Sequence, residues 1–266
     1  MAKKKTIFIT RRMPKAVLER AKLHFNVFGN IDDNHYDSNA LINKSQGADG
    51  LLICSNDKIN RLTTLAFPEK IKIISCYTAG FENVDLEATK ERNIVVTNSP
   101  DSVTEPTAEI AMLLMLGAAR RGAEADKLIR SEKWLGWHTQ FMIGESLSGK
   151  RLGIFGMGRI GQALANRARG FGLEIHYHNR SRLSPEVEAG AIFHNTSESL
   201  LKVSDILSLN CALTSETTNF LNEKRISLLP NRSIVINTAR GEVIDDNALI
   251  QSLTKGKIYA AGLDVY

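Results

Sequence analysis

The feature that most constrains the fold of this chain is the glycine-rich stretch Gly156-Met157-Gly158-Arg159-Ile160-Gly161. It follows a short apolar run, Arg151–Phe155, and it opens a segment with the apolar spacing of a helix, Gln162–Ala168. Between a strand and a helix, this glycine spacing is typical of a dinucleotide-binding turn. The alternative is a glycine turn that joins a strand to a helix without binding a nucleotide.

Each glycine of this turn has its own expected role. Gly156 permits the tight turn, Gly158 lets the backbone approach a pyrophosphate, and Gly161 lets the helix pack on the strand. The phosphates are expected at the start of the helix, where backbone N–H groups and the helix dipole favour an anion.

Composition narrows the class of protein. The 266 residues suffice for one large domain or two ordinary ones, and 43% apolar and 24% charged residues are typical of a soluble globular protein. The longest apolar stretch, Ile110–Ala119, is too short to span a bilayer, and too few apolar residues follow the N-terminal lysines for a secretory signal. We therefore expect a cytoplasmic protein without a membrane partner.

Cysteine content and charge exclude further classes. Cys54, Cys76 and Cys211 are odd in number and far apart, which predicts reduced thiols and no metal site. The net charge of +5 comes from scattered Lys and Arg without an aromatic-basic module, so we do not expect a nucleic-acid partner. Attraction of an anionic cofactor and substrate accounts for a mild positive balance.

Strand and helix patterns alternate along both halves of the chain, which predicts an α/β fold with two parallel sheets covered by helices on both faces. The expected strands of the first hundred residues are 7–9, 25–28, 50–54, 72–76 and 94–97. Those of the second half are 152–155, 173–178, 205–209, 233–237 and 258–265. We expect a first domain over residues 1–100 and a dinucleotide-binding domain over residues 101–266.

The junction between the halves has a break at Ser99-Pro100-Asp101 and then a capping-box pattern, Ser102–Glu105. The pattern predicts a long, nearly all-apolar helix over about 107–120, buried in its domain or against another subunit. A polar arm with Trp134 and Trp137 follows. Tryptophans on such an arm favour a subunit contact, with packing inside the same chain as the alternative.

The segment Asn179-Arg180-Ser181-Arg182 predicts which dinucleotide is bound. Dinucleotide-binding sheets usually place Asp or Glu about 20 residues after the glycines to hold the ribose 2′-hydroxyl. Here two arginines and a serine stand in place of that acid. Arginine matches a phosphate dianion with a two-pronged fork, so we expect NADP(H) as the preferred cofactor and NAD(H) as a possible one. A solvated turn is the alternative for these arginines.

Three further groups lie where expected strands end, the edge at which parallel sheets bind ligands. Arg240, flanked by small residues, suits a carboxylate next to a carbonyl, and a surface ion pair is its alternative. The turn Thr78-Ala79-Gly80 offers backbone N–H groups to a carboxylate. Asp264 is placed to accept from a carboxamide, or serves as a cap.

Taken together, these motifs resemble the D-isomer-specific 2-hydroxyacid dehydrogenases over the whole chain. The resemblance is carried by the segments T-A-G-F-E-N-V-D, V-T-E-P-T-A-E, G-M-G-R-I-G, H-N-R-S-R, N-T-A-R-G-E-V-I-D and A-A-G-L-D-V. Within the family, H-N-R-S-R is most similar to the NADPH-using glyoxylate/hydroxypyruvate reductases.

The resemblance implies a flavodoxin-like substrate domain and a Rossmann cofactor domain, with the active site in the cleft and a homodimer joined through a helix and arm of the cofactor domain. It implies that Arg240 binds the substrate carboxylate and polarises the ketone, with the backbone of Ala79 and Gly80 on the same carboxylate. It assigns cofactor contacts to Arg159, Ile160, Asn179, Arg180, Ser181, Arg182, Cys211, Thr238, Ala239 and Asp264.

The chain departs from the family pattern at its end. The family pairs its arginine with a glutamate and a histidine, which we expect beyond Tyr266, together with the helix that returns to the first domain. None of the six histidines of this sequence matches that position: His24, His35, His138, His176, His178 and His194.

We therefore expect an NAD(P)H-dependent reductase of glyoxylate or hydroxypyruvate whose C-terminal segment is missing from this chain. One alternative is a catalytically inactive dimer that senses the dinucleotide. Another, within the enzyme class, is a D-3-phosphoglycerate or D-lactate dehydrogenase.

Overall fold

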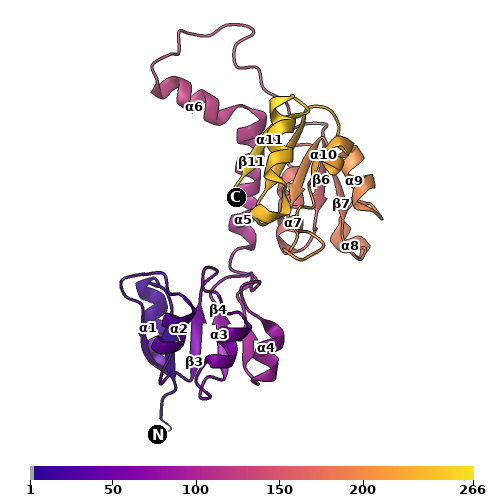
Figure 1. Cartoon of the computed structure of the whole chain (residues 1–266). Helices are drawn as coiled ribbons and strands as arrows, with labels where there is room; N and C mark the ends of the chain where they lie inside the picture. Colours follow the sequence, from indigo (N-terminus) through magenta and orange to yellow (C-terminus); the bar gives the residue numbers. More distant parts are fainter. Residues whose placement is uncertain (1–2) are drawn as a thin grey trace. The chain divides into compact units, whose positions relative to one another are not determined.

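The structure is a computed structural model that describes residues 3–266 (Figure 1). The chain divides into two compact units, the first ending at Ser102 and the second running from Val103 to Tyr266. Each unit is a parallel sheet with helices on both faces, and each is described by itself below.

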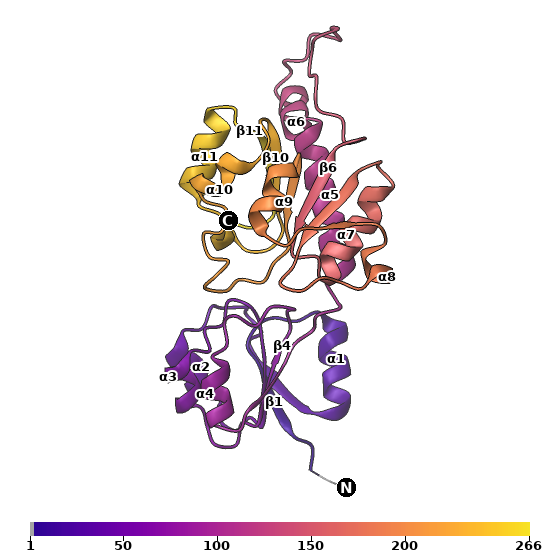
Figure 2. The same cartoon turned by 90° about the vertical axis from the view of Figure 1, so that its right-hand side faces the viewer.

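The first unit has five parallel strands in the order β2-β1-β3-β4-β5. The strands are β1 (Thr6–Ile9), β2 (Asn26–Gly29), β3 (Gly50–Ile53), β4 (Ile73–Cys76) and β5 (Val95–Thr97). The helices are α1 (Lys15–His24), α2 (Ser38–Lys44), α3 (Arg61–Ala66) and α4 (Leu86–Glu91). Helix α1 lies on one face of the sheet, and α2, α3 and α4 lie on the other (Figure 2).

The second unit has six parallel strands in the order β11-β10-β9-β6-β7-β8. The strands are β6 (Arg151–Phe155), β7 (Glu174–His178), β8 (Ile192–Phe193), β9 (Ile206–Leu209), β10 (Ser233–Asn237) and β11 (Ile258–Leu263). The helical elements are α5 (Thr104–Ala119), α6 (Gly122–Arg130), α7 (Arg159–Arg169), α8 (Pro185–Glu188), α9 (Ser197–Val203), α10 (Glu223–Leu228), the 3-10 turn Gly241–Val243 and α11 (Asp246–Thr254).

Two apolar cores cover the two faces of the second sheet, which is why β9 and β10 consist almost entirely of buried residues. Helices α5 and α7 supply one core, in which Met115 and Leu164 are fully buried. Helices α9, α10 and α11 supply the other, with Leu200 and Ile226. Burial on both faces fixes the register of these strands, and hence the place of each residue that follows them.

The predicted α/β class with two doubly wound parallel sheets is confirmed, but the capping box is wrong. The residue before α5 is Val103, which has no capping side chain, and the Ser102 hydroxyl instead donates to the carbonyl oxygen of Ser99 at 2.9 Å. Helix α5 also buries one side only, because Leu113 on the other side is exposed. No helix within residues 3–266 is long and apolar enough to cross a membrane.

Candidate cofactor and substrate sites

The glycine turn after β6 has the backbone that its sequence predicts. Gly156 has φ +96°, and a Cβ there would lie 2.8 Å from the backbone nitrogen of Cys211. A Cβ on Gly161 would lie 2.7 Å from the carbonyl oxygen of Gly156, so only glycine allows α7 to pack this closely on the turn. A Cβ on Gly158 would meet nothing within 4 Å, which leaves open space beside the start of α7. The turn therefore fits a pyrophosphate in the manner predicted.

A pocket of about 560 Å³ opens beside this turn. It lies at the carboxyl ends of β6, β7 and β9, where strand order reverses and ligands of doubly wound sheets bind. Its lining comes from the ends of β6 and β7, the loops after β6, β7 and β9, the start of α9, and α10: Phe155, Gly156, Gly158, His178, Asn179, Arg180, Ser181, Ser197, Asn210, Cys211, Ala212, Thr214, Glu216, Thr217, Phe220 and Arg225.

The loop after β7 reaches the pocket with three of its four predicted residues, Asn179, Arg180 and Ser181. Asn179 bridges the loop to the glycine turn, because its Oδ1 accepts from the N–H of Met157 at 2.6 Å. The fourth predicted residue, Arg182, does not line the pocket and instead pairs with Glu188 at 2.8 Å.

An aromatic wall of the pocket was not predicted from the sequence. Phe155 stacks on Phe220 with ring centroids 3.8 Å apart, and on His178 at 5.7 Å. The guanidinium carbon of Arg225 lies 4.5 Å from the centre of the Phe220 ring. Flat apolar surfaces of this kind suit the ring of a nucleotide base.

Cys211 contributes an uncharged surface to the pocket. Burial raises the pKa of its thiol to about 11, so the thiol stays protonated near neutral pH. A protonated thiol is a poor nucleophile. Its place therefore fits contact with a cofactor, and the raised pKa of the thiol argues against a role as an attacking group at neutral pH.

Beyond this pocket, the predicted residues Thr238, Ala239 and Arg240 follow β10 along the same edge of the sheet. The side chain of Asn237 shapes their turn, because its Oδ1 accepts from the N–H of Ala239 at 3.0 Å and its Nδ2 donates to the carbonyl oxygen of Arg240 at 2.9 Å. Asn237 was not singled out from the sequence, because as the last residue of an apolar strand it carries no pattern of its own.

Asp264 lies beside this turn, after β11. Its N–H donates to the carbonyl oxygen of Asn237 at 3.0 Å. The predicted group formed by Thr238, Ala239, Arg240 and Asp264 is therefore brought to the ends of two adjacent strands.

In the first unit, the predicted turn Ala79-Gly80 follows β4. Its carbonyl oxygens are already bonded, that of Ala79 to the side chain of Asn98 at 2.7 Å and that of Gly80 to the Thr78 hydroxyl at 2.8 Å. Within residues 3–266, neither N–H donates a backbone hydrogen bond. These two N–H groups are therefore available to an anion.

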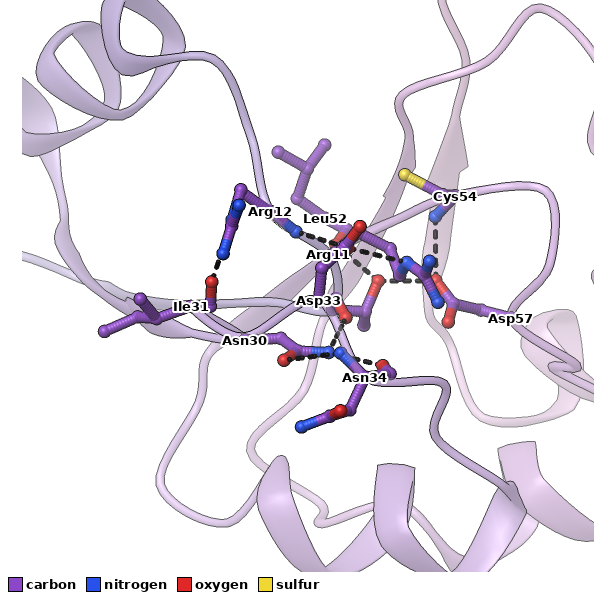
Figure 3. Close-up of polar contacts among 10 residues, drawn as sticks. Arg11, Arg12, Asn30, Ile31, Asp33, Asn34, Leu52, Cys54 and Asp57 are labelled. Carbon is purple, nitrogen blue, oxygen red and sulfur yellow. Dashed lines mark hydrogen bonds and ion pairs between the residues drawn. The ribbon is translucent and has the colours of Figure 1, made fainter.

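The same unit has a polar cluster at the ends of β1 and β3 that was not predicted (Figure 3). The buried carboxylate of Asp57 accepts from the hydroxyl of Thr10 and, at 2.8 Å, from the N–H of Cys54. Beside it, Nε of Arg11 lies 3.0 Å from the carboxylate of Asp33. Burial, and then the charge of Asp57, raise the pKa of Cys54 to about 11.

The described part of the chain, residues 3–266, contains no group of three or more His, Cys, Asp or Glu side chains placed to hold a metal ion. Glycine turn, guanidinium groups and free N–H groups all favour negatively charged ligands.

Comparison with known proteins agrees with this chemistry. Residues 112–266, more than half of the chain, match the family model of the D-isomer specific 2-hydroxyacid dehydrogenase, NAD binding domain. The chain is 44% identical to a glycerate dehydrogenase of Hyphomicrobium methylovorum, over 99% of this chain and 82% of that protein. It is 41% identical to a glyoxylate reductase of Thermococcus litoralis, over 99% and 80% of the two chains.

A solved structure extends the likeness to the fold. The NADPH-dependent glyoxylate/hydroxypyruvate reductase of Sinorhizobium meliloti, in complex with NADP and malonate, matches with a TM-score of 0.87 and 29% identity over 99% of this chain and 80% of that one. Sequence, fold and glycine turn thus agree, and the predicted family and enzyme class are confirmed: the chain belongs to the D-isomer specific 2-hydroxyacid dehydrogenases, which interconvert 2-ketoacids and D-2-hydroxyacids with a nicotinamide dinucleotide.

Proposed function

We propose that this enzyme reduces a small 2-ketoacid, glyoxylate or hydroxypyruvate, to the D-2-hydroxyacid with NADP(H) as its preferred cofactor and NAD(H) as a possible one. The observation that carries the preference is the group Asn179, Arg180 and Ser181, which lines the pocket where a carboxylate would select NAD(H). A second arginine in the pocket is not needed, because the guanidinium of Arg180 and the hydroxyl of Ser181 already offer several donors to a phosphate. A relative whose structure contains NADP is named as an NADPH-dependent reductase.

The remaining cofactor contacts that we propose follow the edge of the second sheet. The backbone at Arg159 and Ile160, in the first turn of α7, is assigned to the pyrophosphate, with Gly156, Gly158 and Gly161 giving it room. Cys211, Thr238 and Ala239 are assigned to the length of the cofactor, and Asp264 to its carboxamide. When bound, the cofactor supplies the hydride for the carbonyl carbon.

The substrate contacts that we propose are anion contacts. Arg240 binds the carboxylate and polarises the ketone, since its planar fork matches two oxygens at once. The N–H groups of Ala79 and Gly80 bind a carboxylate as well. A general acid must protonate the ketone oxygen as the hydride arrives.

We also propose that the protein is a cytoplasmic homodimer joined through the helix and arm of residues 104–150. Trp137 is 77% exposed and Leu135 is 90% exposed on this arm, and α6 has no buried residue. Exposed apolar side chains in sequence clusters mark contact surfaces. Sedimentation equilibrium should give twice the monomer mass, and Trp137→Lys should shift the equilibrium toward the monomer.

A steady-state panel tests the catalytic proposal. Glyoxylate, hydroxypyruvate and pyruvate are each offered to the full-length protein with NADPH and with NADH. We expect kcat/KM for glyoxylate or hydroxypyruvate to exceed that for pyruvate, and NADPH to exceed NADH by at least about tenfold, the worth of one charge-assisted phosphate contact.

Two results would count against the proposal in different ways. Equal kcat/KM with both dinucleotides would refute the NADP(H) preference but leave the proposed 2-ketoacid reductase activity standing. Tight NADPH binding without oxidation by any of the three ketoacids would favour the dinucleotide-sensing alternative. Arg240→Lys, which keeps the charge and loses the fork, should lower kcat/KM by about 100-fold.

A further inference from the structure

The loop between β7 and α8 is tied to the protein at two points, and the first is at its start. Oδ1 of Asn179 accepts from the N–H of Met157 at 2.6 Å, and Nδ2 of Asn179 donates to the carbonyl oxygen of Met157 at 3.3 Å. The loop therefore begins at a fixed distance from the glycine turn that we assign to the pyrophosphate.

The second point is an ion pair at the end of the loop. Nε of Arg182 lies 2.8 Å from Oε1 of Glu188, and Nη2 of Arg182 lies 3.0 Å from Oε2. The side chain of Glu188 is only 7% exposed, whereas that of Arg182 is 64% exposed. Arg182 therefore uses one edge of its guanidinium to cover a buried carboxylate.

Tyr177 connects this ion pair to the sheet. It is a fully buried residue of β7, and its hydroxyl donates to Oε1 of Glu188 at 2.5 Å. The same hydroxyl accepts from the N–H of Leu183 at 3.0 Å. Leu183 follows Arg182 directly, so the side chain and the backbone at the end of the loop are held by one network.

The charges in the network favour keeping the ion pair between Arg182 and Glu188 formed. The hydrogen bonds from Arg182, and then from Tyr177, hold the pKa of Glu188 below its ordinary value, so the carboxylate is ionised at neutral pH. If Arg182 turned away toward a ligand, it would leave this buried carboxylate without its cation. Leaving a buried carboxylate without this partner is unfavourable, although the arginine itself is mostly exposed.

The two residues between the fixed points differ from Arg182. Arg180 and Ser181 line the pocket, and within residues 3–266 neither side chain makes a hydrogen bond or ion pair with the protein. Their donors are therefore available to a ligand in the pocket, while the donors of Arg182 on its Nε edge are used.

We propose that Arg182 is a positioning residue for cofactor specificity: with Glu188 and Tyr177 it fixes the loop so that Arg180 and Ser181 hold the 2′-phosphate of NADP(H). This inference rests on the proposed NADP(H) preference and deepens it. It replaces the expectation, drawn from the sequence, that Arg182 binds the phosphate itself.

The test measures dissociation constants by calorimetry with two probes, adenosine 2′,5′-bisphosphate and 5′-AMP, which differ only in the 2′-phosphate. Arg180→Ala should weaken the bisphosphate about 100-fold, the effect of losing a charge-assisted contact. Arg182→Ala should weaken it about tenfold by loosening the loop. Binding of 5′-AMP should change less than about twofold in both variants, since only the 2′-phosphate is affected.

A double-mutant cycle separates positioning from direct contact. If Arg182 acts through Glu188, then Glu188→Gln should weaken the bisphosphate by itself and add nothing in the Arg182→Ala background. In the Arg182→Ala background, Glu188→Gln also shows how much binding changes merely because a negative charge near the phosphate is removed. Tyr177→Phe changes no charge, and it should weaken binding of the bisphosphate severalfold while leaving binding of 5′-AMP unchanged.

The opposite sign would overturn the inference. If Arg182 binds the phosphate, releasing it by Glu188→Gln should tighten the bisphosphate, and only while Arg182 is present. Full binding by Tyr177→Phe together with Arg182→Ala would also overturn it. Failure of the proposed NADP(H) preference is recognised separately, because the wild-type protein would then bind both probes equally and Arg180→Ala would have no effect.

Discussion

The two units have the same architecture but use the reversal point of their sheets in opposite ways. In the second unit, strand order reverses between β6 and β9, and the residue after β6 is Gly156, which leaves a pocket. In the first unit, the reversal lies between β1 and β3, and the residue after β1 is Thr10, whose hydroxyl donates to the buried Asp57. One reversal point is opened by the lack of a side chain, and the other is filled by a polar pair.

The difference shows that the strand order gives a place for a ligand without requiring one. A ligand crevice at the reversal point needs backbone groups that are free to bind. In the first unit, Asp57 takes up the N–H of Cys54, the residue after β3. In the second unit, the turn after β6 keeps open space at Gly158, and Cys211 lines the pocket.

The largest expected effect comes from filling the open reversal point. Gly156→Ala places a Cβ 2.8 Å from the nitrogen of Cys211 on a backbone with φ +96°, so the turn must move. We expect the dissociation constant for NADPH, measured by fluorescence titration, to rise at least about 100-fold because the phosphate cradle is displaced.

Gly149→Ala is the matched control for this variant. Gly149 also has a left-handed backbone, φ +77°, but a Cβ there would meet nothing within 4 Å. It should lower the free energy of unfolding by about 1 kcal/mol and leave NADPH binding unchanged. Equal NADPH affinity in Gly156→Ala and wild type would show that the reversal point does not depend on a glycine.

The closed reversal point should respond in stability instead of binding. Asp57→Ala leaves the hydroxyl of Thr10 and the N–H of Cys54 without their acceptor inside the unit. We expect the free energy of unfolding, from urea titration followed by circular dichroism, to fall by about 3 kcal/mol. Asp57→Asn keeps an acceptor oxygen and should lose less, and Asn56→Ala, at an exposed position of the same loop, should lose almost nothing.

The comparison would fail if Asp57→Ala weakened NADPH binding as strongly as Gly156→Ala does. Such a result would mean that the cluster at Thr10 and Asp57 takes part in the cofactor site. We expect NADPH affinity to change less than about twofold, because no residue of this cluster lines the pocket of the second unit.

The sequence predicted features that depend on neighbouring residues better than features that depend on contacts between different elements. The glycine turn and the alternating strands are local patterns, and both the fold class and the turn followed from them. Arg182 was predicted to bind the phosphate because it belongs to the segment that replaces the usual acid, and nothing in that spacing indicates that it pairs with the buried carboxylate of Glu188. Phe220 reaches the pocket from a long irregular loop and Arg225 from the short helix α10, and no periodicity in the sequence indicates that these two side chains point into it.

The capping box shows the same limit at short range. Ser102 and Glu105 have the spacing of the motif, but the Ser102 hydroxyl bonds to Ser99 within the preceding turn. Serine side chains bond readily to nearby backbone groups, so a turn competes with a cap for the same hydroxyl. A pattern of this kind predicts that a helix begins nearby, but it does not fix the first residue of the helix to better than about one turn.

At the amino ends of their strands the two sheets are alike, because an aspartate binds the first residue of β1 in one and of β6 in the other. The smallest expected effect compares how much each aspartate stabilises its unit. Asp49 accepts from the N–H of Thr6, the first residue of β1, at 2.7 Å, and Asp205 accepts from the N–H of Arg151, the first residue of β6, at 3.0 Å. Asp205 also takes both prongs of the Arg151 guanidinium, at 2.8 and 2.9 Å, whereas the nearest lysine nitrogen to Asp49 is at 3.3 Å.

These contacts set how each aspartate responds to acid. The hydrogen bonds from the Arg151 side chain, first among several causes, hold the pKa of Asp205 below its ordinary 3.8, and the N–H of Thr6 does so first for Asp49. A lowered pKa stabilises the folded state fully above the ordinary value, and this contribution is lost as the pH falls below it. We expect Asp205→Asn to lower the free energy of unfolding by about 1.5 kcal/mol at pH 7, and Asp49→Asn by about 0.5 kcal/mol, because a bidentate arginine contributes more than loosely held lysines.

Urea titrations at pH 7 and pH 3 measure the free energy of unfolding of both variants, and the deficit of each variant relative to the wild type should shrink at pH 3. A larger deficit for Asp49→Asn than for Asp205→Asn would show that the backbone N–H, which the two edges share, contributes more than the arginine that only one of them has.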